Sequence, residues 1–234
     1  MTNPWTAALI TLFLWWFSTG AILWRVRHAD RAGGTAHQMS VVLGLPLLAG
    51  GLWGLGTSLD DATPTGTYTG FLAALALWGW IELAFLSGVI TGPNTRTASP
   101  FARGWDRFRQ ATLTILWHEA ALIAALALLA YAAHGAANPF GLYTFAVLFF
   151  ARLSAKLNLF FGVPRIHTEF LPRPLAHLAS HFRHARMNWL FPASITGLTF
   201  ATGCWLERAT SAPTDATMIG HALLAALTAL ALLE

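Results

Sequence analysis

The stretch YTGFLAALALWGWIELAFLSGVIT, residues 68–91, decides the fold. It contains a single charged side chain, Glu82, within a mostly apolar run. A helix needs about 20 such residues to cross the hydrocarbon core of a bilayer, so this stretch predicts a transmembrane helix. Pro64 stands before it, and Gly92 and Pro93 follow it, as is typical of helix ends.

Further apolar runs of similar length predict more transmembrane helices. They cover residues 5–24, 39–58, 113–133, 140–162, 187–206 and 215–233. The first run is longer than the apolar region of a signal peptide, so we expect it to be retained as a span. The expected fold class is all-α: a polytopic integral membrane helix bundle of about seven transmembrane helices. Nothing in the sequence separates a second domain, so we expect one domain over residues 1–234.

The overall composition agrees with a membrane protein. Hydrophobic residues make up 56% of the chain and charged residues 10%, whereas soluble domains average about 25% charged residues. The formal net charge is +4, but the basic residues lie in short segments between apolar runs. This pattern indicates membrane topology and argues against nucleic-acid binding. The single cysteine, Cys204, excludes an intrachain disulfide.

The arginines of the connecting segments predict the orientation in the bilayer. They cluster after the first, third and fifth expected spans, while the segments after the second and fourth spans contain neither Lys nor Arg. The segment after the sixth span contains Arg208 alone. By the positive-inside rule, we expect the N-terminus on the outer side of the membrane and the C-terminus in the cytoplasm.

Several polar side chains interrupt the apolar runs in the cytoplasmic half of the expected bundle. An ionisable group inside a bilayer is costly and is by default a candidate functional residue. At about 1.5 Å of rise per residue, the five ionisable side chains among them are expected at similar depths in the bilayer. We expect a polar cluster made of Glu82, His118, Glu119, Arg152, Lys156 and Asn158.

Two interpretations of this cluster are open from the sequence. In the first, Glu82 pairs with Arg152 and Glu119 pairs with Lys156, which fixes the register of three helices without binding anything. In the second, the cluster binds a ligand. The carboxylates and His118 would hold a transition metal, or the basic side chains would hold a tetrapyrrole or a lipid phosphate.

The segment RPLAHLASHFRHAR, residues 173–186, is rich in histidine. Apolar side chains at helical spacing predict an amphipathic helix over residues 174–185, lying on the cytoplasmic interface. Its histidines would then share one face. One interpretation is a metal site, with ligands drawn from His167, Glu169, His177, His181 and His184. The other is an interfacial helix that faces lipid phosphates. The remaining histidine clusters of membrane di-iron hydroxylases are absent from the sequence.

Strings spread over nearly the whole chain resemble the photosynthetic complex assembly protein 2 family, the PuhE type. These strings are LWWFSTGAIL (14–23), IELAFLSGVITGP (81–93), WHEAALI (117–123), KLNLFFGVP (156–164), EFLP (169–172) and MNWLFPASIT (187–196). The chain departs from the family pattern after EFLP, where Arg173 and Pro174 follow and where His177 and His181 replace expected aromatic residues. This departure weakens the interpretation of the loop as a metal site.

The resemblance implies a function and a cellular location. The family consists of polytopic membrane proteins of phototrophic bacteria, so it implies the bacterial inner or intracytoplasmic photosynthetic membrane. In that membrane, the orientation expected from the positive-inside rule places the N-terminus in the periplasm. It also implies a membrane assembly factor for the reaction centre and light-harvesting complex. Reaction-centre or light-harvesting subunits, or pigment-synthesis enzymes, would be its partners beside the lipid bilayer, and bacteriochlorophyll or a tetrapyrrole precursor would be its ligand. Positions within the matching strings are Glu82, His118, Glu119, Lys156, Asn158 and Glu169, with Arg152 just upstream of one of them.

A membrane metalloenzyme is the alternative. It would act on a tetrapyrrole or an isoprenoid, with Glu82, His118 and Glu119 as metal ligands or as acid and base. Glu169 is a further candidate ligand. A transporter is a third class, but no inverted repeat or broken helix in the sequence supports it.

Overall fold

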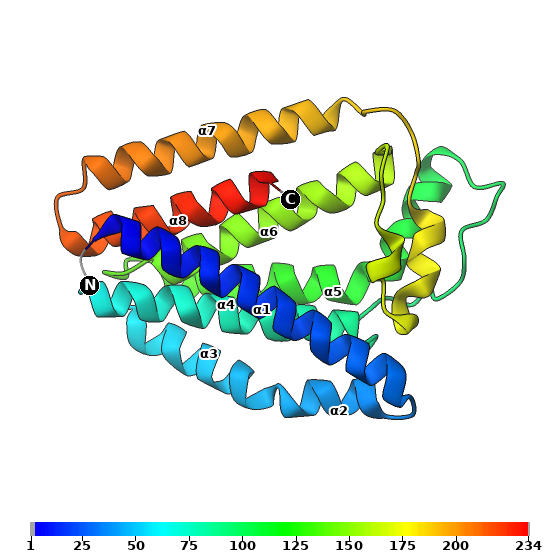
Figure 1. Cartoon of the computed structure of the whole chain (residues 1–234), viewed down its shortest axis with the longest axis horizontal. Coiled ribbons are helices and arrows are strands. Elements are labelled where there is room, and N and C mark those ends of the chain that lie inside the picture. The colour runs from blue at the N-terminus through cyan, green and yellow to red at the C-terminus, as the bar shows by residue number, and fades with distance from the viewer. Residues whose placement is uncertain (1–2, 234) are drawn as a thin grey trace.

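The computed structural model describes residues 3–233, and helices joined by irregular connections make up its fold (Figure 1). The α-helices are α1 (Pro4–Ala32), α2 (Ala36–Leu43), α3 (Leu45–Ser58), α4 (Pro64–Leu86), α5 (Gly104–Ala132), α6 (Phe140–Phe161), α7 (Leu190–Thr210) and α8 (Asp215–Leu233). Two 3₁₀ helices, η1 (Thr168–Phe170) and η2 (Arg173–His181), lie between α6 and α7. Residues 3–233 contain no β-strand, only an isolated bridge between Val163 and His184.

The predicted helical membrane bundle is confirmed. Six helical segments are long and apolar enough to cross a bilayer: α1, α2 with α3, α4, α5, α6 and α8. The segment expected at 187–206 is α7, which at 21 residues is long enough to cross. It is less apolar and is not among the six, so its transmembrane course stays a prediction.

The span expected at 39–58 consists of two helices, α2 and α3, which meet at Gly44. Pro46 explains the break. Its ring lacks an N–H group and clashes with the carbonyl of the residue four positions earlier, which interrupts an α-helix. Figure 1 shows the resulting change of direction between the two helices.

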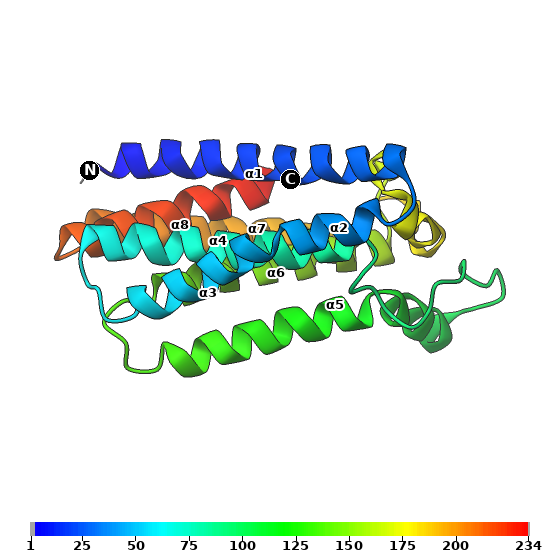
Figure 2. The same ribbon diagram turned by 90° about the horizontal axis from the view of Figure 1, so that it is seen from below.

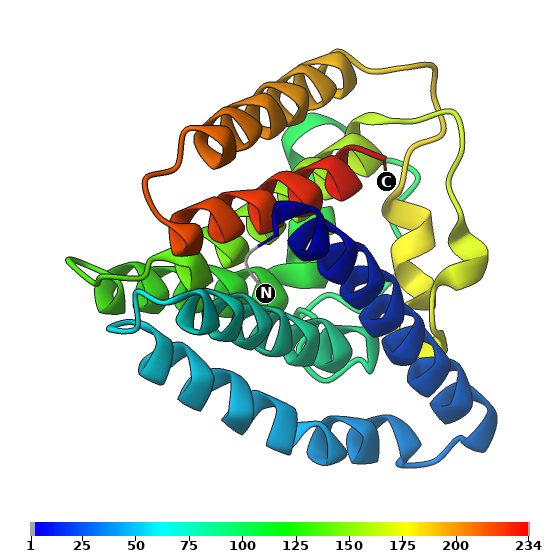
Figure 3. The same ribbon diagram turned by 60° about the vertical axis from the view of Figure 1, so that its left-hand side comes forward.

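Helix α4 forms the centre of the bundle. It packs against α3, α6 and α8, and its buried side chains occur on all sides of the helix, as expected for a helix that is apolar all round. Phe71 and Trp78 lie in this core, where the Trp78 ring meets Phe145 of α6 edge to face at 5.3 Å. Figure 3 shows α8 between α1 and α7, and in Figure 2 α1 and α5 lie on opposite outer sides of the bundle.

The span expected at 68–91 ends earlier in the structure, at Leu86. Gly88 has a left-handed φ of 76°, which glycine adopts without a steric penalty. Its N–H donates to the Phe85 carbonyl, and the Val89 N–H donates to the Ala84 carbonyl. These two hydrogen bonds form a Schellman motif that closes the helix. The residues after Gly88 therefore leave α4 and run toward α5.

The arginine-bearing connections meet at one end of the bundle. The Ala98 N–H donates to Ser180 Oγ at 2.8 Å, which joins the α4–α5 connection to η2. The Arg173 N–H donates to Asp30 Oδ1 at 3.1 Å, which joins η2 to the end of α1. The three segments grouped by their arginines in the sequence thus form one surface.

The amphipathic helix predicted over 174–185 is present, but it is a 3₁₀ helix and it is shorter than predicted. The structure has a 3₁₀ helix that ends at His181. With three residues per turn, Leu175, Leu178 and His181 fall on one face, and all three are buried. This face packs against Phe85 of α4. The histidines therefore do not share a face: His181 points inward, whereas His184 lies beyond the helix and is exposed.

Candidate functional site

Helix α5 docks on the bundle through a narrow stripe. Its buried residues are Thr114, His118 and Leu122, one per turn at intervals of four, so they lie along a single face. His118 is at the centre of this stripe and has no exposed surface. Its ring stacks on Phe85 of α4, with 4.2 Å between the ring centroids. This imidazole is therefore part of the contact between α4 and α5.

Glu82 connects α4 to both neighbouring helices. Its Oε2 accepts a hydrogen bond from Arg152 Nη2 of α6 at 3.0 Å. Its Oε1 lies 3.6 Å from His118 Nε2 of α5, which is beyond hydrogen-bonding distance. The Glu82 side chain is 10% exposed, against 38% for Arg152. A buried carboxylate is thus paired with a guanidinium that reaches the surface of the bundle.

The second ion pair joins α5 to α6. Lys156 Nζ donates to Glu119 Oε1 at 2.5 Å, and both side chains are mostly buried. Lys156 Nζ also lies 5.7 Å from the centroid of the Phe85 ring, within reach of a cation–π interaction. Both pairs that the sequence offered as its first interpretation are therefore present, and together they join α4, α5 and α6.

Four buried polar atoms of this cluster have no hydrogen-bond partner in the described part of the chain. They are Glu82 Oε1, His118 Nδ1, His118 Nε2 and Arg152 Nε. Buried polar atoms are rarely left without a partner, because each one costs about 1–3 kcal/mol. The two ion pairs therefore leave hydrogen-bonding atoms without partners at the Glu82 end of the cluster.

A backbone insertion beside the cluster was not predicted from the sequence. The N–H groups of Trp117 and His118 both donate to the carbonyl of Thr91, at 2.8 and 3.2 Å. The Leu113 carbonyl of α5 accepts from the Asn94 N–H at 3.1 Å. The segment after α4 thus forms backbone hydrogen bonds with α5 at the two residues that precede Glu119. The only signal in the sequence is Gly92-Pro93, which indicates a helix end.

Asn158 belongs to a different contact. Its Nδ2 donates to Ser194 Oγ of α7 at 3.2 Å, and Ser154 Oγ donates to the same oxygen at 2.7 Å. Ser154 and Asn158 are four residues apart on one face of α6, whereas Arg152 and Lys156 occupy another. The structure therefore separates Asn158 from the charged cluster and places it between α6 and α7.

The loop residues proposed as metal ligands also lie apart from the cluster. His167 Nδ1 is 2.8 Å from Glu169 Oε1, and this pair is exposed. His181 Nε2 is 3.1 Å from the Arg96 carbonyl oxygen, and His177 is partly buried in η2. Within residues 3–233, no three His, Cys, Asp or Glu side chains come close enough together to hold a metal ion.

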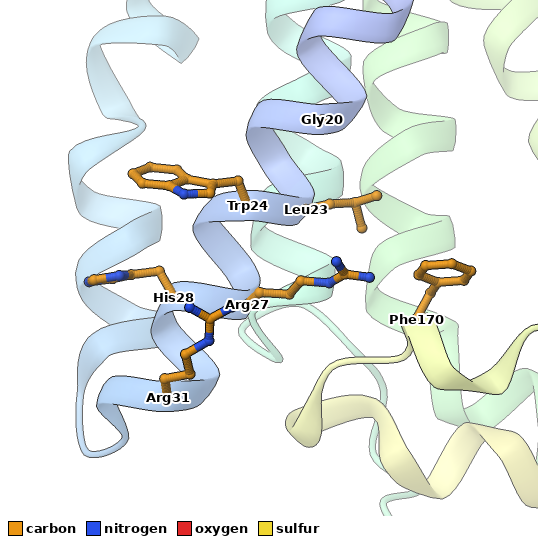
Figure 4. A pocket seen from close by; sticks show the side chains of 7 residues that line it. All are labelled: Gly20, Leu23, Trp24, Arg27, His28, Arg31 and Phe170. Carbon is orange, nitrogen blue, oxygen red and sulfur yellow. The ribbon is translucent and has the colours of Figure 1, made fainter.

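Two surface pockets occur at the arginine-rich end. The first lies against α1 and is shown in Figure 4, where Arg27 extends toward Phe170 of η1. The second lies between the start of α5 and the end of α6, where the Arg107 guanidinium stacks on the Phe160 ring at 4.1 Å. Arg107 Nη2 also donates to the carbonyls of Phe160 and His181. Both pockets combine arginine with aromatic side chains.

The fold and the buried ion pairs define a polytopic helical membrane protein. The chain belongs to the family described as "Protein of unknown function (DUF3623)", whose model matches residues 1–234. A relative from Rhodobacter capsulatus, "Uncharacterized 30.4 kDa protein in puhA 5'region", is 63% identical over 234 residues, which is 100% of this chain and 85% of the relative. No solved structure matches the chain.

Proposed function

We propose that the protein is a membrane assembly factor of the PuhE type for the bacterial photosynthetic reaction centre and light-harvesting complex. The name of the Rhodobacter capsulatus relative supports this proposal, because it places that protein's gene in the puhA 5' region. The resemblance to the photosynthetic complex assembly protein 2 family points in the same direction and extends over nearly the whole chain. Reaction-centre or light-harvesting subunits and pigment-synthesis enzymes are the partners that this function implies.

The observation that carries the proposal is the exposure of Arg152. This residue lies near the middle of α6, at a depth where a charge facing lipid is costly. Glu82 holds one of its nitrogens, yet the side chain is 38% exposed and its buried Nε has no partner within residues 3–233. A polar group of a partner helix, or an oxygen-bearing substituent of a pigment, would satisfy the guanidinium at this depth. An assembly factor transiently presents such a surface to its client.

Direct ligation of a bacteriochlorin magnesium by His118 does not fit the closed arrangement. The nitrogen donors are present and have no partners, but the ring has no exposed surface and is covered by Phe85. A pigment would reach this imidazole only if α5 separated from α4. We therefore assign pigment or partner recognition to the accessible Arg152 face, and the packing of α5 to His118.

The alternative function is a membrane metalloenzyme that acts on a tetrapyrrole or an isoprenoid. It is favoured by the approach of Glu82 Oε1 to His118 Nε2 at 3.6 Å, which brings an oxygen donor and a nitrogen donor side by side without other partners. Such a site needs at least a third ligand. Glu119, the nearest candidate along the sequence, is held by Lys156.

Pigment analysis of a deletion strain distinguishes the two functions. For the assembly factor, we expect less reaction-centre and light-harvesting complex with unchanged pools of bacteriochlorophyll precursors. An accumulating precursor would overturn this function and favour the enzyme. Complementation with an Arg152→Gln variant, with the amount of variant protein measured by immunoblotting, then tests the Arg152 face: we expect the near-infrared absorption of the complexes to stay low even after correction for that amount. Full restoration of that absorption would remove Arg152 from the proposal.

A further inference from the structure

The pocket against α1 has a polarity gradient along the helix axis. At its inner end lie Gly20 and Leu23, and at its outer end lie Arg27 and Arg31, at the arginine-rich end of the bundle. Gly20 and Arg27 are seven positions apart in the sequence, which corresponds to about 10 Å along the helix. An apolar half and a cationic half thus follow each other along the direction in which a lipid molecule is oriented in a bilayer.

The cationic half has no carboxylate partner of its own. Neither Arg27 nor Arg31 forms an ion pair with Asp or Glu in the part of the chain that the structure describes. Asp30, which lies between them in sequence, accepts from the Arg173 N–H at 3.1 Å and pairs with His37 at 3.0 Å. The two guanidinium groups are therefore free to bind an anion.

Contacts between two elements shape this half of the pocket. The Arg27 guanidinium lies 5.3 Å from the centroid of the Phe170 ring in η1, and Figure 4 shows the two side chains extended toward each other. Along another edge of the pocket, the Trp24 ring stacks on His28 with 6.0 Å between the centroids. Trp24 is 69% exposed, as is usual for tryptophan at the level of lipid headgroups.

The apolar half is open at Gly20, which is exposed. A Cβ atom added at Gly20 would meet no other atom within 4 Å. Leu23 borders this space on the same face of α1. The space lies toward the membrane interior from the arginines, where an acyl chain belongs.

We propose that this pocket binds the headgroup phosphate of an anionic phospholipid. Arg27 and Arg31 bind the phosphate, and the upper part of an acyl chain lies over Gly20 beside Leu23. Charge selects the headgroup, because the amine of a zwitterionic lipid adds a positive charge to a pocket that already holds two. The apolar half favours a lipid over a free phosphate ion, which gains nothing from that surface. This inference does not depend on the proposed function.

Native mass spectrometry of the detergent-solubilised full chain tests the proposal. The protein is titrated with phosphatidylglycerol and with phosphatidylethanolamine of the same acyl chains. We expect one phosphatidylglycerol molecule to be retained in preference to phosphatidylethanolamine. In an Arg27→Gln, Arg31→Gln double variant, its affinity should fall by roughly tenfold or more. Equal retention of the two lipids by the unchanged protein would overturn the proposal.

Three further experiments separate this pocket from general surface charge and from a site for free anions. An Arg165→Gln, Arg186→Gln variant removes the same charge from exposed positions outside the pocket and should bind as the unchanged protein does. An equal loss in both double variants would overturn the site. Gly20→Leu places a side chain over the apolar half, where an added Cβ meets nothing within 4 Å, and should also weaken lipid binding. Full retention would place the lipid elsewhere. Displacement of the lipid by inorganic phosphate alone would mean a site for free anions and would overturn the lipid assignment.

Discussion

Arg152 Nη2 of α6 donates to Glu82 Oε2 of α4 at 3.0 Å, so a single hydrogen bond joins a guanidinium that reaches the surface to a buried carboxylate. Removing one partner of such a pair is usually more destabilising than removing both, because the remaining charge has no partner. The pair therefore serves both stability and, in our proposal, recognition, and substitutions can separate these two roles.

The Glu82–Arg152 pair predicts different results for single and double substitutions. Arg152→Gln alone should lower the free energy of unfolding by about 1–3 kcal/mol, less than for a fully buried pair, because Arg152 is partly exposed. Adding Glu82→Gln should restore most of this stability but not the level of photosynthetic complex. Thermal unfolding in detergent and near-infrared absorption of complemented cells measure the two effects. Restoration of both by the double variant would mean that pairing is the whole role of these residues.

Two substitutions of His118 distinguish the packing of its ring from the hydrogen-bonding capacity of its ring nitrogens. His118→Ala should lower stability by about 2–4 kcal/mol, because it removes a buried ring that stacks on Phe85. His118→Phe keeps an aromatic ring of similar size in contact with Phe85 and should retain most of the stability. In thermal unfolding of the purified variants, we expect a lower midpoint for His118→Ala than for His118→Phe. If His118→Phe also restores the photosynthetic complexes in a deletion strain, the ring nitrogens have no part in the function.

The sequence predicted the helical bundle and offered the two ion pairs as one of two interpretations, because these depend on composition and on depth along helices. Arg152 and Lys156 share a face at i and i+4, and the acids of the other two helices lie at matching levels. His118 and Glu119, about 100° apart on α5, face different partners, as the helical period requires. Helical periodicity did not predict the type of helix in η2, because the spacing of Leu175 and Leu178 fits a 3₁₀ helix and an α-helix equally well. Their spacing alone could not decide between the two.

The contact of Thr91 with α5 was beyond sequence analysis, because backbone groups make it and every residue carries them. At Gly92 this contact requires a residue without a side chain. A Cβ atom there would lie 2.0 Å from the Leu113 carbonyl oxygen. Gly92→Ala should therefore push this segment away from α5 and lower stability by about 1–3 kcal/mol in thermal unfolding.

Gly56→Ala is the matched control for this substitution. An added Cβ at Gly56 of α3 meets nothing within 4 Å, so the alanine should leave stability unchanged or raise it by up to about 1 kcal/mol. If Gly92→Ala were as stable as Gly56→Ala, the backbone of α5 would not be in contact with the segment after α4.

The environment of His177 predicts that the stability of the loop at residues 173–181 depends on pH. Burial, together with the nearby positive charge of His181, lowers the pKa of His177 below its ordinary value. The folded loop thus favours the neutral imidazole, so its stability is complete above about pH 6.5 and falls as the pH drops toward the lowered pKa. Hydrogen exchange of residues 173–181 should be faster at about pH 5.5 than at pH 7.5, after correction for intrinsic rates. His177→Asn should remove most of this dependence, whereas His184→Gln, at an exposed position, should leave it unchanged.

The orientation and the course of α7 are tested together by alkaline phosphatase fusions, which are active only outside the cytoplasm. The arginine-rich connections meet at one end of the bundle, so the positive-inside rule predicts inactive fusions after Gly33 and Arg165. Fusions after Gly135 and Ser211 should be active, because these connections lie at the other end. The fusion after Ser211 is the decisive one for α7: its activity requires that α7 crosses the bilayer. An inactive fusion there, with an active one after Gly135, would leave α7 on the cytoplasmic surface and reduce the number of spans.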